Sequence, residues 1–328
     1  MLTDTLEVAA GRNARLDFSA EKADVVVADS PIRPGTTSEK PSDKRKRFHA
    51  IPLVLLLLAA LILPLQAAAR NCLAQDADYY VASGGSDTND GSAAAPWATP
   101  THAAIWVQQN LDLCSHRVTI YLSGDGCRPF TVVGPFVGAR IPGSVRFVGN
   151  AVNPTLCRIV ASSGAAIALW ENAAVEVSGV QVDATGCATN QASGFIVSDS
   201  RLYLAGVWFG FACWAQVHAL GNTTRVSWVG GNIVVVGSAG FGILAEDKAQ
   251  VNFNGATVNF FASVGYTHAF AYADQASVID FTGASFIYNG FGVYGRRYVS
   301  EQGALIRTGG NVLPGNAAGL VQTYGLVM

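Results

Sequence analysis

Short runs of alternating hydrophobic and polar residues recur along this chain, and a glycine follows each run. The first run is Ile120-Tyr121-Leu122-Ser123-Gly124. Later copies end at Gly149, Gly179, Gly206, Gly230, Gly255 and Gly283, and a degraded copy ends at Gly310. Such alternation predicts a strand with one buried face. The glycines are 24 to 30 residues apart. A unit of that size cannot bury its hydrophobic face alone, so consecutive units must stack.

Two further hydrophobic segments accompany the glycines. A hydrophobic residue three positions after most of them, such as Val182 or Val258, predicts a second strand beyond a tight bend. A short hydrophobic run before the later glycines, such as 240–243, predicts a third strand. Three short strands per unit predict an all-β fold, a parallel β-helix of about eight coils over residues 118–313, with coils about 4.8 Å apart. Leucine-rich repeats, propeller blades and β-sandwiches do not match this period.

The chain before the repeat begins with two unusual segments. Residues 1–50 carry 17 of the 44 charged residues, and this composition predicts disorder. Residues 51–69 hold a hydrophobic stretch of about 15 residues, shorter than the roughly 20 of a membrane-spanning helix. The preceding basic run and the small residues Ala67-Ala68-Ala69 predict a signal peptide cleaved after Ala69. An uncleaved signal anchor with a cytoplasmic N-terminus is the alternative, and it alone makes the membrane a partner. A start codon assigned too far upstream also explains residues 1–50.

Residues 70–117 open the exported part with a strand, a polar loop and a helix. Tyr79-Tyr80-Val81 predicts the strand, and residues 101–111 place Ala104, Val107 and Leu111 on one helical stripe. The open end of a stacked β-coil would template other strands. We therefore expect this helix to cap the N-terminal end of the β-helix. Residues 314–328 are expected to form a C-terminal tail.

Two segments resemble known β-helix proteins. The sequence YYVASGGSDTNDGSAAAPWATPTHA (79–103), followed by VTIYLSGDG (118–126), resembles the opening segment of right-handed parallel β-helix proteins with a pectin-lyase-like fold. The sequence GGNVLPGNAAG (309–319) is similar to the ends of phage and prophage tail-fibre-like β-helix proteins. The resemblance implies a right-handed β-helix over about 78–319. It does not imply one activity, because this fold hosts lyases, hydrolases, adhesins and inert spikes.

All six cysteines lie in the exported part: Cys72, Cys114, Cys127, Cys157, Cys187 and Cys213. An even number of cysteines in an oxidising compartment predicts disulfides. Cys157 and Cys187 each lie eight residues after a repeat glycine, which favours a bridge between adjacent coils. Cys213, seven residues after its glycine, competes for Cys187, and buried free thiols are the alternative for each pair.

A row of mostly acidic residues lies seven to nine positions before the repeat glycines: Glu171, Asp199, Asn222, Glu246, Asp274 and Glu301. We expect these residues to form a ladder along one edge of the coils. Adjacent coils, or coils one apart, would separate carboxylates by about the 5–5.5 Å of a retaining glycosidase or the 6.5–9.5 Å of an inverting one. Glu246 and Asp274, on adjacent coils, are the candidate catalytic pair. Turns also favour Asp and Asn, whose side chains bond the local backbone, so a solvated ladder without catalysis explains the same pattern.

Residues close to this pair in sequence are candidates for carbohydrate binding: Trp214, Trp228, Asp247 and Lys248. The resemblance to polysaccharide lyases would imply a calcium cluster of aspartates with an Arg or Lys base, and the sequence shows no such set. The histidines show no metal-binding spacing either, so we expect no metal and no cofactor. A net charge of −2 gives no indication of nucleic-acid binding.

Together these patterns predict an exported protein that recognises extracellular or cell-surface polysaccharide. A polysaccharide hydrolase or lyase that uses Glu246 and Asp274 is the first alternative. A phage-derived tail spike or fibre subunit is the second alternative. The spike predicts a homotrimer, whereas the other hypotheses are compatible with a monomer.

Overall fold

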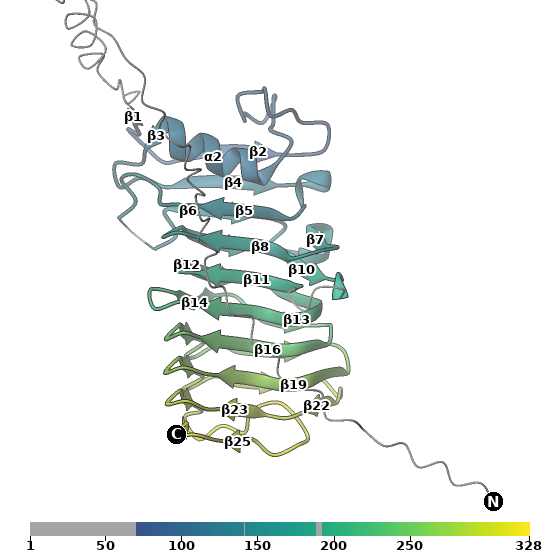
Figure 1. Ribbon diagram of the computed structural model, residues 1–328. Coiled ribbons are helices and arrows are strands. Elements are labelled where there is room, and N and C mark those ends of the chain that lie inside the picture. Colours follow the sequence, from purple (N-terminus) through teal and green to yellow (C-terminus); the bar gives the residue numbers. More distant parts are fainter. Residues whose placement is uncertain (1–69, 141, 188–191) are drawn as a thin grey trace, which may run out of the picture. The chain divides into compact units, whose positions relative to one another are not determined.

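The computed structural model describes residues 70–140, 142–187 and 192–328, which belong to one compact unit, Leu65–Met328. Parallel strands stack into a β-solenoid of about 7 turns, close to the eight coils expected (Figure 1). The polar segment 1–50 and the predicted signal segment 51–69 lie outside the described residues. Within those described, no helix is long and apolar enough to cross a membrane.

One sheet has ten parallel strands, and they follow the order of the chain. Most of these strands are the alternating runs that precede the repeat glycines. Every second side chain points toward the core; Val118 and Ile120 of the second strand, for example, are buried. The strands are β2 (Ala77–Val81), β4 (Val118–Leu122), β6 (Val145–Val148), β9 (Ala174–Ser178), β12 (Arg201–Ala205), β14 (Arg225–Gly230), β17 (Gln250–Asn252), β20 (Val278–Asp280), β24 (Leu305–Arg307) and β26 (Leu326–Val327).

The second sheet has fourteen strands and joins the two remaining positions of each turn. Strands after the repeat glycines are β7 (Arg158–Ala161), β10 (Gln181–Ala184), β15 (Ile233–Val235), β18 (Thr257–Phe260) and β21 (Ser285–Ile287). The strands that close each turn of the solenoid are β5 (Phe130–Val133), β8 (Ala165–Trp170), β11 (Ser193–Ser198), β16 (Ala239–Glu246), β19 (Val264–Ala273), β22 (Val293–Gly295), β23 (Tyr298–Ser300) and β25 (Leu320–Val321). The long strand β13 (Trp208–Leu220) runs through both positions and unites them, because it pairs with β10 and β15 at its start and with β11 and β16 further along.

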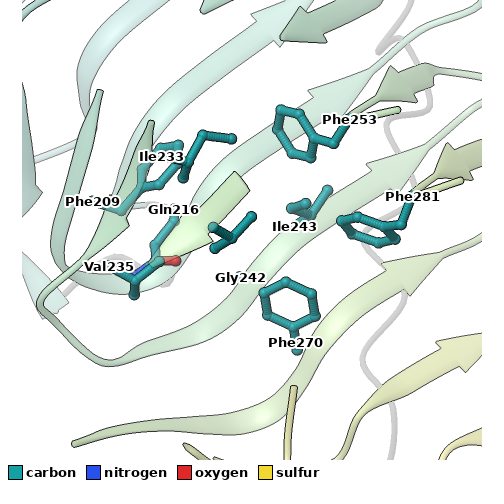
Figure 2. A pocket seen from close by; sticks show the side chains of 10 residues that line it. Phe209, Gln216, Ile233, Val235, Gly242, Ile243, Phe253, Phe270 and Phe281 are labelled. Atoms are coloured by element: carbon teal, nitrogen blue, oxygen red, sulfur yellow. The ribbon is translucent and has the colours of Figure 1, made fainter. Parts of the chain in front are cut away.

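The hydrophobic core lies between the two sheets and follows the stack. Its largest fully buried side chains include Phe147, Phe195, Phe260 and Phe281. Figure 2 shows Phe253, Phe270 and Phe281 among the side chains around a small cavity in this core, of about 20 Å³. Such a volume has room for about one water molecule, so this cavity is too small for a sugar ring.

Helix α2 (Pro100–Asn110) covers the N-terminal end of the solenoid, as the sequence predicted (Figure 1). The helix begins after Thr99, whose hydroxyl accepts a hydrogen bond from the His102 N–H at 3.2 Å. Its buried residues include Ala104 and Val107, which the hydrophobic stripe had indicated. The short strands β1 (Asn71–Cys72) and β3 (Leu111–Asp112) pair beside it. At the other end, residues 314–328 do more than form a tail, because β25 and β26 extend both sheets by one strand.

Three disulfides join Cys72 to Cys114, Cys127 to Cys157 and Cys187 to Cys213, with Cα–Cα distances of 5.6, 5.2 and 5.1 Å. The predicted bridge between Cys157 and Cys187 is therefore wrong, and the competing partner Cys213 takes Cys187. The two cysteines of the predicted pair are not equivalent, because the chain after the first glycine contains the short 3₁₀-helix η2 (Pro154–Leu156). Cys157 consequently precedes β7 directly, whereas Cys187 follows the end of β10, the partner of β7.

Candidate functional site

The strands that close each turn of the fourteen-stranded sheet end in register along one edge. Ser198 pairs with Leu220, and Leu220 with Glu246. The pairs Ala245–Ala273 and Ala273–Ser300 place the following residues, Glu246, Asp274 and Glu301, opposite one another. We call this row the strand-end column, and it comprises Trp170, Ser198, Leu220, Glu246, Asp274 and Glu301.

The residue after each strand end begins a tight turn with positive φ. This turn column comprises Glu171, Asp199, Gly221, Asp247, Gln275 and Gln302, with φ between 44° and 98°. The ladder expected from the sequence is therefore divided between two columns, except for Asn222, which follows Gly221 of the turn column. Glu246, Asp274 and Glu301 share the first, whereas Glu171 and Asp199 lie in the second. Positions counted back from the repeat glycines were uncertain by one residue. A difference of one residue is enough to move a side chain from the strand-end column to the turn column.

An aromatic cluster lies on the outer surface of the same sheet. The ring of Phe241 lies 5.0 Å from the ring of Trp214, 4.7 Å from that of His268 and 5.2 Å from that of Tyr272. Phe241 forms a hydrophobic cluster with Ala215 and Leu244 that is separate from the main core. Strand alternation places Leu244 on the outer face, because its neighbours Ile243 and Ala245 in β16 face the main core.

A depression of about 490 Å³ lies beside this cluster, and we call it the acidic hollow. His268, Tyr272, Arg296 and Glu301 are among the residues that line it. The Tyr272 hydroxyl donates a hydrogen bond to the Glu301 carboxylate. Burial raises the pKa of Tyr272, and the bond to Glu301 raises it further. The phenol therefore stays protonated and remains a donor at neutral pH.

Asp274 is the most buried of the three carboxylates at the strand ends, with 7% of its surface exposed. Its Oδ1 accepts a hydrogen bond from the Gln275 N–H at 2.5 Å, and its Oδ2 accepts one from Gln302 Nε2 at 3.4 Å. Burial raises the pKa of Asp274, the Gln275 N–H opposes the rise, and the negative charges of Glu301 and Glu246 add to it. This direction is the one that a general acid requires.

Glu246 has a histidine partner that the sequence did not reveal. His218 Nε2 lies 2.7 Å from Glu246 Oε2, and most of the imidazole is buried. The histidine precedes the strand end of β13 by two residues, so strand alternation puts it on the same face as Glu246 of the neighbouring turn. Phe241, His268 and Tyr272 were also missed. The only pattern these residues share is that they lie outside the main core, and the sequence reveals this only once the pairing of the strands is known.

The candidate binding residues are divided between the two sheets. Trp214 lies in the aromatic cluster. Trp228 lies in β14 of the ten-stranded sheet, where its Nε1–H donates to the Gly231 carbonyl at 3.0 Å and its ring packs against the main core. Asp247 and Lys248 form the turn after Glu246, and the Lys248 N–H donates to the Gln275 carbonyl at 3.0 Å. The structure thus places Asp247 and Lys248 at the edge that carries the acids, and Trp214 in the aromatic cluster of the same sheet. Trp228 lies in the other sheet.

The acids of this edge stand in a line along the stack. Accordingly, among the residues that the structure describes, no three His, Cys, Asp or Glu side chains converge as metal ligands. No family model matches the chain, and searches of curated proteins and of solved structures also found no match.

Proposed function

We propose that this chain is an exported β-solenoid protein that binds polysaccharide in the acidic hollow. One observation carries the proposal: three carboxylates on consecutive turns, Glu246, Asp274 and Glu301, lie beside a cluster of aromatic rings. Carboxylates accept hydrogen bonds from sugar hydroxyls, and aromatic side chains offer an apolar face to the C–H side of a sugar ring. Shallow surfaces of this composition suit an extended, hydroxyl-rich ligand.

Three further features support export and the class of ligand. The three disulfides bind all six cysteines, and such bonds persist in oxidising compartments. The segment 51–69 has the pattern of a signal sequence. The opening segment resembles that of β-helix proteins with a pectin-lyase-like fold, many of which act on or bind polysaccharides.

Binding to a panel of neutral, acidic and amino-sugar oligosaccharides tests the proposal, with isothermal titration calorimetry as the measurement. We expect one class to bind and Tyr272→Ala to weaken its binding. Glu171→Gln is the matched control, because Glu171 occupies the same edge three turns away and should leave affinity unchanged. Failure of every oligosaccharide to bind would refute the proposal, as would equal affinity of the Tyr272→Ala protein.

Hydrolysis of the bound polysaccharide is a second candidate, and the environment of Asp274 favours it. Glu246 and Glu301 flank Asp274 on adjacent strands, about 4.8 Å along the stack on either side. Retaining glycosidases hold their two carboxyl groups about 5–5.5 Å apart, one of them protonated at neutral pH. The raised pKa of Asp274, which burial causes first, supports the role of acid for this residue. Glu246, whose Oε2 lies 2.7 Å from His218 Nε2, is then the nucleophile.

New reducing ends in a polysaccharide digest test this second candidate, and ultraviolet absorbance of unsaturated products separates a hydrolase from a lyase. Asp274→Asn and Glu246→Gln should each abolish the release of reducing ends while binding persists. Cleavage that survives both substitutions would remove these residues from the mechanism. Binding without any cleavage would leave recognition as the function.

A further inference from the structure

The first turns of the solenoid contain more chain after their repeat glycines than the later turns do. Later strands begin two or three residues after a repeat glycine, as β10 does after Gly179. Strands β5 and β7 begin six and nine residues after Gly124 and Gly149. The added residues include the 3₁₀-helices η1 (Gly124–Gly126) and η2 (Pro154–Leu156). Insertions in a repeat protein form loops on one face, and that face is often the one that binds a ligand.

A depression of about 560 Å³ lies between these two insertions, and we call it the tyrosine hollow. Residues from both insertions line it, Gly124 from η1 and Leu156 from η2. None of its lining residues is charged, and the polar ones include Tyr80, Ser123 and Asn150. Ligand pockets commonly measure about 300–1,000 Å³, so this hollow has room for a sugar residue.

Tyr121 forms an aromatic wall of the tyrosine hollow. Its ring stacks on that of Tyr80, with the ring centroids 5.3 Å apart. On the next turns the register places Val148 opposite Tyr121, and Ser178 opposite Val148. The side chains therefore become smaller along the outer face of the ten-stranded sheet, and the face of the Tyr121 ring away from Tyr80 is left without a second ring. Tyr121 is 36% exposed.

The insertion that carries η2 is held in place by the fold. Asn150 Oδ1 accepts hydrogen bonds from the Val152 and Asn153 N–H groups at 3.1 and 2.8 Å. The disulfide between Cys127 and Cys157 joins the end of this insertion to the preceding turn. A wall that is ordered before the ligand arrives lowers the entropic cost of binding.

We infer that the tyrosine hollow is a second carbohydrate-binding site and that it takes a neutral sugar residue. The C–H side of a pyranose ring would lie on Tyr121 and beside Leu156. The hydroxyls of Tyr80 and Ser123 and the amide of Asn150 are donors and acceptors for sugar hydroxyls. A uronic-acid or amino-sugar residue would lose hydration of its charge without gaining an ion pair from the lining. The site lies outside the acidic hollow and does not depend on a ligand there.

Calorimetric titration of the Tyr272→Ala protein isolates this site, because that substitution removes an aromatic ring from the acidic hollow. The probes are cellohexaose, xylohexaose, mannohexaose and the galacturonic acid hexamer. We expect a neutral hexasaccharide to bind and the acidic hexamer to bind more weakly or not at all. Failure of all three neutral probes, or equal or tighter binding of the acidic one, would overturn the inference and leave the proposed function standing. Binding that Tyr272→Ala leaves unchanged and Tyr121→Ala weakens would support this site and refute the acidic hollow.

Further variants locate the binding. Tyr121→Ala, added to Tyr272→Ala, should weaken binding of the neutral hexasaccharide by about two- to tenfold, the contribution of one aromatic contact, and Tyr121→Phe should weaken it less. Leu156→Asp should weaken it as well, and Leu156 is 65% exposed, so the fold should tolerate the change. Tyr203→Ala is the matched control, because this half-buried tyrosine of the same sheet does not line the hollow. Unchanged binding by both Tyr121→Ala and Leu156→Asp, or an equal loss in the control, would overturn the inference.

Discussion

The early and late turns of the fourteen-stranded sheet share one backbone geometry and carry different chemistry. In the early turns the strand-end column holds Trp170, Ser198 and Leu220; in the late turns it holds Glu246, Asp274 and Glu301. The turn that follows has positive φ in both regions. All three disulfides lie between Cys72 and Cys213, and therefore in the early turns.

This difference shows whether the turn itself requires an acidic residue at the strand end. Because the same turn forms after Trp170, Ser198 or Leu220, it does not require an acid at the strand end. The local preference of Asp for turns explains Asp199 and Asp247, which occupy the turn itself. It does not explain three consecutive acids one position earlier, where burial first, and then the negative charges of Glu301 and Glu246, raise the pKa of Asp274. We therefore expect the neighbouring acids to lower the stability of the late turns, whereas the disulfides stabilise the early turns.

Removing a disulfide from the early turns should have the largest effect on stability. Replacing both Cys127 and Cys157 with Ser opens a bridge that spans 30 residues. We expect the free energy of unfolding to fall by about 3–4 kcal/mol, since the bridge restricts the unfolded chain. Urea denaturation measures the loss. Solenoid turns contact mainly their neighbours, so limited proteolysis should cut the early turns first. Uniform cleavage of both regions would show that they unfold as one unit.

The network around Asp183 gives the second test. This buried carboxylate accepts hydrogen bonds from Arg158, Gln181 and the Phe211 N–H. A methyl group added at Gly210 would collide with it. Asp183→Ala should cost about 1–3 kcal/mol, because it strands buried donors. Thermal unfolding measures both this loss and that of Gly210→Ala. Gly210→Ala should destabilise the native protein more than it destabilises the Asp183→Ala protein. Equal effects in the two backgrounds would place the strain of the methyl group elsewhere.

Much of the solenoid could be predicted because its signal repeats. Alternation marked the strands of the ten-stranded sheet, and the stripe of Ala104 and Val107 marked the capping helix. The disulfides could not be predicted by counting, because the insertion η2 (Pro154–Leu156) shifts Cys157 relative to its apparent equivalent. The pairing of residues on neighbouring turns depends on inserted segments. The sequence shows how long an insertion is, but it does not show whether the insertion lies before or after a given strand.

The candidate site could be predicted only in part for the same reason. The pair Glu246 and Asp274 does lie on adjacent strands at one edge, as expected. His218, Phe241 and Tyr272 escaped notice, because an outward-facing residue in a strand has no sequence signature until its neighbours in other turns are known. Trp228 illustrates the opposite failure. It is close to Trp214 in sequence, but it belongs to the other sheet.

Asp274→Asn tests whether the late turns bear a cost in stability. The pKa of Asp274 is raised from 3.8 in the fold, first by burial. Below pH 3.8 both folded and unfolded states are protonated, so the cost is absent; it grows as the pH rises and is complete above the raised pKa. Asn resembles the protonated carboxyl. The variant should therefore have a higher Tm than the native protein at neutral pH and lose this advantage in acid.

Asp280→Asn is the control of opposite sign for this titration. Burial opposes ionisation of Asp280, but hydrogen bonds from Thr282 and the ion pair with Arg307 hold its pKa below the usual value. Its ionised form stabilises the fold, so Asp280→Asn should lower the Tm at neutral pH, with the loss disappearing in acid. If both variants shift the Tm in the same direction at neutral pH, the two carboxylates do not differ as their surroundings indicate.

Tyr272→Phe should have the smallest effect on stability. It removes the hydroxyl that donates to Glu301 and keeps the ring against Phe241. The expected loss is about 0.5–1.5 kcal/mol, the usual net contribution of one hydrogen bond. Tyr121→Phe, on the ten-stranded sheet, is the control, because Tyr121 stacks on Tyr80 and is partly exposed. In a double-mutant cycle, Tyr272→Phe and Glu301→Gln should not be additive. Additive losses would mean that the hydroxyl and the carboxylate contribute separately, and that Glu301 is not held by Tyr272 for its ligand.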